Sequence, residues 1–163
     1  LAFKQSLSAA VGRTASKGAT PVYKTIVCAI GLGSKEKGEH LLHMAQGLLD
    51  TDGSLHLVHA IERFPSLVRR GPDDWAVSVI NEAEEKLSQL CREPAIPALV
   101  HVRTGRAADT ILAVAAETSA DLIVVAAHAN DVFDRLFGST VDNVVHHAKC
   151  SVHIDRISSM AKH

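Results

Sequence analysis

Gly138-Ser139-Thr140 is the stretch of the sequence whose residue types are best suited to binding an anion. It opens a predicted helix, because apolar residues from Val141 to Ala148 recur at helical spacing. Ser139 is the expected N-cap of this helix. Amides without partners at a helix amino terminus attract phosphate and carboxylate groups. The pattern therefore predicts a small anion site at the start of this helix.

Two histidines, His59 and His128, lie at the carboxyl ends of predicted strands, where parallel sheets place their functional groups. We favour the interpretation that each has a backbone hydrogen-bond partner. The other histidines do not predict a metal site. His40 and His43 lie three residues apart on one predicted helix, whereas His56 and His59 point to opposite faces of one strand. Neither pair has a cysteine or carboxylate at a spacing that would complete a ligand set, so no metal is predicted.

No nucleophile with an activating base can be assembled from the sequence. Ser34 and Ser139 lack the surrounding Gly-x-Ser-x-Gly pattern of a nucleophile elbow. The loop Gly31-Leu32-Gly33 lacks the third glycine of a dinucleotide-binding loop, and the stretch from Gly33 to Gly38 lacks the Lys-Ser/Thr that completes a phosphate loop. We therefore predict that the protein is not an enzyme.

Apolar runs alternate with amphipathic stretches along the chain. The run from Asp121 to Ala127 is typical of a strand covered on both faces, which makes Val124 and Val125 core residues. Asp50 to Gly53 are predicted to end the first helix as a turn. The whole pattern predicts strands at 23–30, 54–61, 98–102, 121–127 and 151–154, and helices at 35–49, 72–90, 106–118 and from 138 onward. This alternation predicts an α/β fold, a doubly wound five-stranded parallel sheet with helices on both faces.

The composition is that of one ordinary globular domain. Of the 163 residues, 47% are hydrophobic and 21% charged, and the formal net charge of −1 gives no electrostatic reason to expect nucleic acid or an acidic membrane surface. No apolar run approaches the roughly 20 residues of a membrane-spanning helix. Three separated cysteines, Cys28, Cys91 and Cys150, favour a reducing compartment. We expect Cys28 and Cys150 to be small core residues in strands.

Residues 1–21 differ from the rest in composition. They contain three basic residues and no acidic residue, and they are rich in Ser, Ala, Thr and Gly. This composition is typical of an organellar targeting segment, but equally of a flexible leader or a cloning remnant. The predicted domain covers residues 22–157, and residues 158–163 form a tail. We expect a cytoplasmic location, or an organellar matrix if residues 1–21 are a targeting segment.

The stretch ADLIVVAAHANDVFDRLFGSTVDNVVHHAKCSVHIDR, residues 120–156, resembles the carboxyl half of a universal stress protein domain. Val102 to Ile111 resembles that family's strand, glycine and small-residue helix start, and Tyr23 to Ile30 resembles its first strand. The resemblance therefore covers residues 22–156. It implies the strand order 3-2-1-4-5. It also implies a homodimer joined through the last strand, Ser151-Val152-His153-Ile154, whose alternating apolar pattern is that of an edge prone to pairing.

The nucleotide-binding branch of this family has Gly-x2-Gly-x9-Gly-Ser/Thr after strand four and an acidic residue after strand one. Gly138 and Ser139 match the end of this pattern, but Ala126 and Ala129 replace the first two glycines, and Gly31 stands in place of the acid. A methyl group where the backbone must approach a phosphate costs on the order of 1 kcal/mol. The chain is therefore closer to the branch that is not expected to bind nucleotide.

Two hypotheses remain open. The first is a dimeric regulatory or interaction module of the universal stress protein type, with weak or absent nucleotide binding. The second is an ATP-binding switch or slow ATP hydrolase, which would use Gly138, Ser139 and Thr140 for the phosphates and the backbone near His59 for the adenine.

Overall fold

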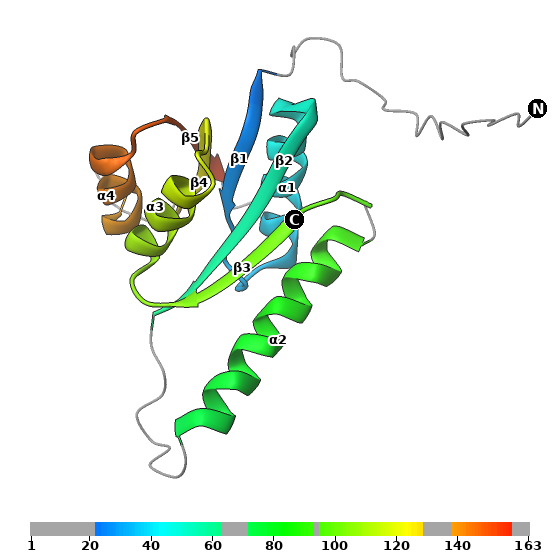
Figure 1. Cartoon of the computed structure of the whole chain (residues 1–163), viewed down its shortest axis with the longest axis vertical. Coiled ribbons are helices and arrows are strands. Elements are labelled where there is room, and N and C mark those ends of the chain that lie inside the picture. Colours follow the sequence, from blue (N-terminus) through cyan, green and yellow to red (C-terminus); the bar gives the residue numbers. More distant parts are fainter. Residues whose placement is uncertain (1–21, 63–71, 93–94, 129–137, 158–163) are drawn as a thin grey trace, which may run out of the picture.

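The computed structural model describes residues 22–62, 72–92, 95–128 and 138–157. They form five strands and four helices in strict alternation: β1 (Tyr23–Ala29), α1 (Lys35–Leu48), β2 (Leu49–Ile61), α2 (Pro72–Arg92), β3 (Leu99–Thr104), α3 (Ala107–Glu117), β4 (Leu122–His128), α4 (Ser139–His147) and β5 (Ser151–Ile157). All neighbouring strands are parallel, in the order β3-β2-β1-β4-β5. Helices α1 and α2 cover one face of the sheet, and α3 and α4 cover the other (Figure 1). The predicted doubly wound fold and strand order are confirmed.

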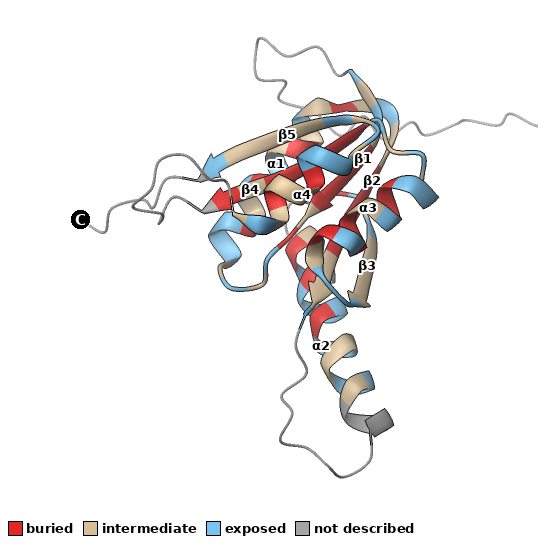
Figure 2. Cartoon of the chain, turned by 90° about the vertical axis from the view of Figure 1, so that its left-hand side faces the viewer, coloured by how far each residue is buried: buried red, intermediate tan, exposed pale blue. Residues whose placement is uncertain are grey.

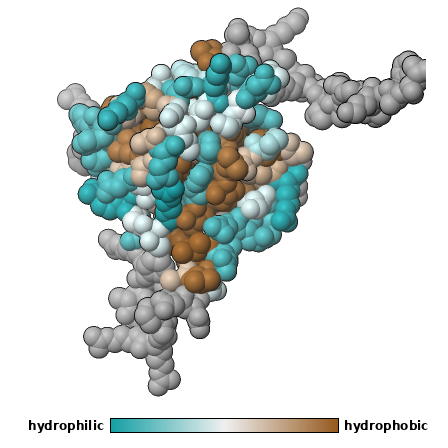
Figure 3. Space-filling view, in the orientation of Figure 1, coloured by the Kyte–Doolittle hydropathy of each residue, from teal (hydrophilic) through white to brown (hydrophobic). Residues whose placement is uncertain are grey.

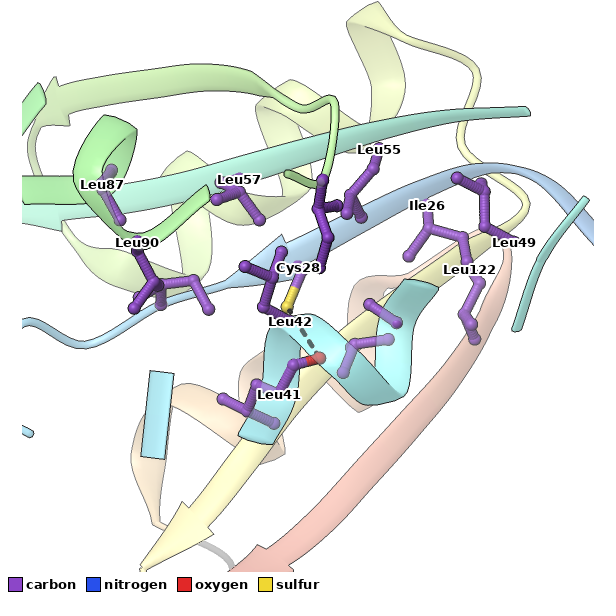
Figure 4. Packing of buried hydrophobic residues seen from close by; sticks show 14 residues of the cluster. Ile26, Cys28, Leu41, Leu42, Leu49, Leu55, Leu57, Leu87, Leu90 and Leu122 are labelled. Carbon is purple, nitrogen blue, oxygen red and sulfur yellow. Dashed lines mark hydrogen bonds between the residues drawn. The ribbon is translucent and has the colours of Figure 1, made fainter. Parts of the chain in front are cut away.

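The sheet separates two hydrophobic clusters, because alternate residues of each strand point to opposite faces. Ile26 and Cys28 of β1 point toward α1 and α2, whereas Val27 points toward α3 and α4, and all three are fully buried. The predicted core residues Val124 and Val125 likewise divide between the two clusters. Burial is concentrated in the middle of the sheet and falls off toward β5 (Figure 2). Figure 4 shows the α1 side of this core, where leucines from strands and helices meet.

The connection between α1 and β2 differs from the predicted turn. The helix passes directly into the strand at Leu49, whose backbone is already extended, and the residues from Asp50 to Gly53 belong to β2. Tyr23 pairs with Leu49, but Thr25 pairs with Ser54, so β2 bulges at this point. Polar turn-forming residues are tolerated here because the bulge lies at the end of the sheet.

Asp121 joins the first residues of three strands through hydrogen bonds. The sequence did not indicate this role. The predicted strand began at this residue, but β4 begins at Leu122. The Asp121 Oδ2 atom accepts hydrogen bonds from the backbone N–H groups of Lys24 and Thr25, at 2.9 and 3.0 Å. Its carbonyl accepts from the N–H of Ser151 at 3.2 Å. Asp121 therefore aligns the start of β4 with β1 through its carboxylate and with β5 through its backbone carbonyl.

The surface of the described residues contains few large apolar side chains. Leu99 at the start of the edge strand β3 is 58% exposed, and Val77 of α2 is also exposed. Figure 3 shows hydrophobic residues down the middle of the face seen in Figure 1, with hydrophilic surface on both sides. No helix among the described residues is long and apolar enough to span a membrane.

Candidate functional site

A cleft of about 690 Å³ opens at the carboxyl ends of the central strands. The strand order reverses between β1 and β4, and parallel sheets bind ligands where this reversal separates the following loops. Six of the residues singled out from the sequence line the cleft: Gly31, His59, Ala126, Gly138, Ser139 and Thr140. Among the described residues of the lining, Lys37 of α1 supplies a positive charge and Glu62 supplies a negative charge. The tertiary structure thus gathers most of the predicted site into one place.

The remaining predicted site residues are not part of this described lining. His128 is the last residue of β4, and its side chain lies outside the described part of the structure. Ala129 lies in the stretch 129–137, which is also outside the described residues. Their roles stay predictions.

The amino terminus of α4 points its first-turn amides at the cleft. Gly138, not Ser139, is the N-cap, and its φ of +87° is a conformation that glycine adopts without strain. Ser139 is instead the first helical residue, so the expected serine cap is wrong. Because a glycine N-cap has no side chain, it leaves these amides available. Among the described residues, no side chain caps this turn.

The other two helices that begin at the cleft are already capped by side chains. The Ser34 hydroxyl accepts from the backbone N–H of Lys37 at 3.4 Å at the start of α1. The Glu62 carboxylate accepts from the N–H of Ala107 at 2.8 Å at the start of α3. An anion entering the cleft would therefore find its donors at α4 rather than at α1 or α3.

His59 connects the ends of two strands at the wall of the cleft. Its Nδ1 atom lies 2.9 Å from the carbonyl oxygen of Ile30, so Nδ1–H is the donor and, in the neutral ring, Nε2 is left as an acceptor. The backbone N–H of Ile30 in turn donates to the carbonyl of Val58 at 2.9 Å. The predicted backbone partner of His59 is thus confirmed.

No described neighbour requires glycine at residue 31. A Cβ atom built at this residue has no described atom within 4 Å, and the same is true of Gly33. The described part of the cleft therefore does not block a side chain at residue 31, where this chain has no acid.

The cysteines do not provide a nucleophile for the cleft. Burial, and secondarily the neighbouring Cys91, raises the pKa of the Cys28 thiol to about 12, so it stays protonated. Its Sγ lies 3.9 Å from the carbonyl oxygen of Leu41, inside the α1-side core. Cys150 lies half-buried between α4 and β5, so the expectation that it belongs to a strand is wrong. All three cysteines are free.

Two histidine contacts were missed because each joins distant parts of the chain. The Nε2 atom of His40 on α1 lies 2.9 Å from the Asp155 Oδ2 atom on β5. This is the distance of an ion pair, but the two atoms do not form a hydrogen bond. The Nδ1 atom of His56 on β2 lies 2.9 Å from the Nε2 atom of His101 on β3. Sequence spacing suggested the pairs His40 with His43 and His56 with His59, and neither describes these contacts.

The His56–His101 pair is shielded from protonation. Burial is the main cause that lowers the pKa of both imidazoles. The neighbouring His101 further lowers the pKa of His56. Arg103 further lowers the pKa of His101, whereas Glu117 raises it. Both rings are therefore neutral at neutral pH.

Acidification is expected to destabilise the protein through this pair. A histidine whose pKa is lower in the folded state binds more protons when unfolded, so its stabilisation is complete above about pH 6.5 and declines as the pH falls below that value. Urea denaturation at pH 7.5 and 5.5 should show a lower midpoint at pH 5.5. The variant His101→Gln should reduce this loss, whereas His43→Gln, on the exposed side of α1, should retain it. Equal midpoints at the two pH values would contradict the prediction.

Sequence comparison identifies the family. The model of the Universal stress protein family matches residues 22–156. The chain belongs to this family. Universal stress protein G of Escherichia coli O157:H7 is 29% identical over 146 residues, which cover 83% of this chain and all of the relative.

Solved structures show the same universal stress protein fold. A protein whose biochemical function was assigned from its structure superposes with a TM-score of 0.66 at 17% identity, covering 83% of this chain and 97% of the other. A universal stress protein in complex with cAMP has a TM-score of 0.52 at 21% identity, covering 83% and 98%. At these identities the likeness extends to the fold alone.

Proposed function

We propose that this universal stress protein acts as a homodimeric regulatory module, with weak nucleotide binding at most. The observation that carries the proposal is the position of β5 at the edge of the sheet. This strand is hydrogen-bonded to β4 along its length, from Ser151 opposite Leu122 to Ile157 opposite His128. It is the last strand of the sheet, so within the described residues its other edge has no neighbour. An exposed edge of this length is a template for pairing with a second copy.

The direction of the backbone groups in β5 indicates where a second copy would pair. The N–H of Ser151 donates toward β4, to the carbonyl of Asp121. Because successive N–H groups of a strand alternate in direction, those of Val152 and Ile154 point away from β4. Both side chains are half-buried and pack against the cluster under α3 and α4, so the strand is held in place while its outer edge stays available.

A proline at Val152 tests the dimer directly. Proline removes an N–H that points outward, and edge strands tolerate it because the bonds to β4 remain. Analytical ultracentrifugation should show twice the 17.4 kDa chain mass for the native protein and the monomer mass for Val152→Pro. The circular dichroism spectrum should be unchanged, which checks that the variant folds. A native protein that is monomeric at the same concentration would contradict the proposal.

A second function, adenine-nucleotide binding, is favoured by one observation. The available α4 amides, Lys37 and the Nε2 atom of His59 surround a cleft of adequate size. The solved universal stress protein with cAMP supports a nucleotide as the ligand class. Ala126 in the lining and the absence of an acid at Gly31 argue for weak affinity.

Three glycine substitutions test the nucleotide function separately from the dimer. Calorimetric titration with ATP and with cAMP in Mg²⁺ measures affinity. Gly31→Asp supplies the missing carboxylate and should raise ATP affinity about tenfold or more, by about 1.4 kcal/mol. Gly33→Asp adds the same charge to the same cleft lining two residues away, so it is the matched control and should leave the ATP affinity unchanged. Gly138→Asp forces a strained φ and places a negative charge at the α4 amides, so it should abolish binding while leaving the dimer intact. No heat with the native protein or Gly31→Asp would end the nucleotide hypothesis.

A further inference from the structure

The His56–His101 pair lies apart from the cleft, on the sheet face that α3 and α4 cover. Strand pairing sets His56 opposite Leu99 and Val58 opposite His101, so the two histidines are diagonal neighbours on one face. Their ring centroids are 5.2 Å apart and the planes are inclined by 31°. His56 is buried at 7% exposure, and His101 is partly open to solvent.

The two facing nitrogen atoms are at hydrogen-bond distance, which also equals the spacing of two nitrogen ligands at a right angle on one metal ion. A first-row metal binds imidazole nitrogen at about 2.0–2.1 Å, so two ligands at a right angle have nitrogens about 2.9 Å apart, whereas tetrahedral ligands have them about 3.4 Å apart. The observed separation between Nδ1 of His56 and Nε2 of His101 is 2.9 Å. Right-angled coordination by nitrogen is the geometry of square-planar or tetragonal Cu²⁺ and Ni²⁺.

The surroundings allow a cation to replace the proton that the rings share. The Arg103 guanidinium forms two hydrogen bonds with Glu117, at 2.7 and 2.6 Å, so its charge is matched beside the pair. The lowered pKa of both imidazoles keeps the two rings neutral at neutral pH, so a change of tautomer, which moves the shared proton to the far nitrogen of its ring, frees both facing nitrogens for a metal ion. No group of three or more metal-binding side chains occurs among the described residues, so water would complete the coordination.

We propose that His56 and His101 form a two-histidine site for a divalent transition metal of the Cu²⁺ or Ni²⁺ type. The site is independent of the dimer edge and of the nucleotide cleft. A metal ion bound at this site would link β2 to the edge strand β3, because one ligand comes from each strand. Metal binding should therefore stabilise the fold as well as occupy the site.

Nickel is the better probe, because Cu²⁺ oxidises free thiols and this chain has three. Calorimetric titration of the full-length protein with NiCl₂ at pH 7.5 should show one equivalent that His101→Gln and His56→Gln each lose. His43→Gln should keep that equivalent. Thermal unfolding should shift upward with Ni²⁺ in the native protein and in His43→Gln, but not in the two site variants.

A measurement on the native protein tests the proposal even where the site variants fold poorly. Paramagnetic Ni²⁺ at less than one equivalent should broaden the ring ¹⁵N signals of His56 and His101 before those of the exposed histidines. Broadening that begins at another histidine, or a His101→Gln variant that binds Ni²⁺ as the native protein does, would overturn the proposal.

Discussion

Leu57→Ala is expected to lower the free energy of unfolding by about 2–5 kcal/mol, the usual cost of removing a fully buried leucine side chain. Leu57 is 0% exposed, and on β2 it lies between Cys28 of β1 and Val100 of β3. Its side chain lies among the leucines of the α1-side cluster (Figure 4). The close-packed sheet cannot collapse around the lost volume, so the cavity adds to the lost burial.

Urea denaturation followed by circular dichroism, at one protein concentration, measures this loss. Leu99→Ala removes the same atoms from a leucine that is 58% exposed, and it should change the free energy of unfolding by no more than about 0.5 kcal/mol. Similar losses in the two variants would show that Leu57 is not at the centre of the core.

Gly53→Ala is expected to destabilise the protein by about 1–3 kcal/mol, through overpacking against backbone. A Cβ atom at Gly53 would lie 2.8 Å from the carbonyl oxygen of Lys24 and 2.7 Å from Leu49 Cδ1. The leucine could move, but the carbonyl belongs to β1, which is held by Asp121. The bulge of β2 therefore depends on a residue without a side chain at this point.

Gly47→Ala is the matched control for this substitution. Gly47 lies near the end of α1, and a Cβ atom there meets no atom of the described residues within 4 Å. Alanine is a better helix former than glycine, so this change should stabilise the protein by up to about 1 kcal/mol. The two variants should shift the thermal midpoint in opposite directions. A Gly53→Ala variant with the native midpoint would mean that the bulge can relax.

The cleft could largely be predicted from local sequence patterns. The glycine-rich loops after β1 and before α4, and His59 at the end of β2, were assigned to one edge of the sheet because parallel strands share the position of their carboxyl ends. What the patterns misjudged was local backbone detail. Gly138 caps α4 in place of Ser139, because a positive φ favours glycine more than a hydroxyl favours the cap.

The sequence by itself determined the order of the elements and the buried identity of β1 and β4, because hydrophobic periodicity is a property of neighbouring residues. Only the tertiary structure decided which distant side chains meet. The contact between His56 and His101 needs the register of β2 against β3, and that between His40 and Asp155 needs α1 to lie near β5. These relations are set by packing across the whole sheet, and no local pattern encodes them.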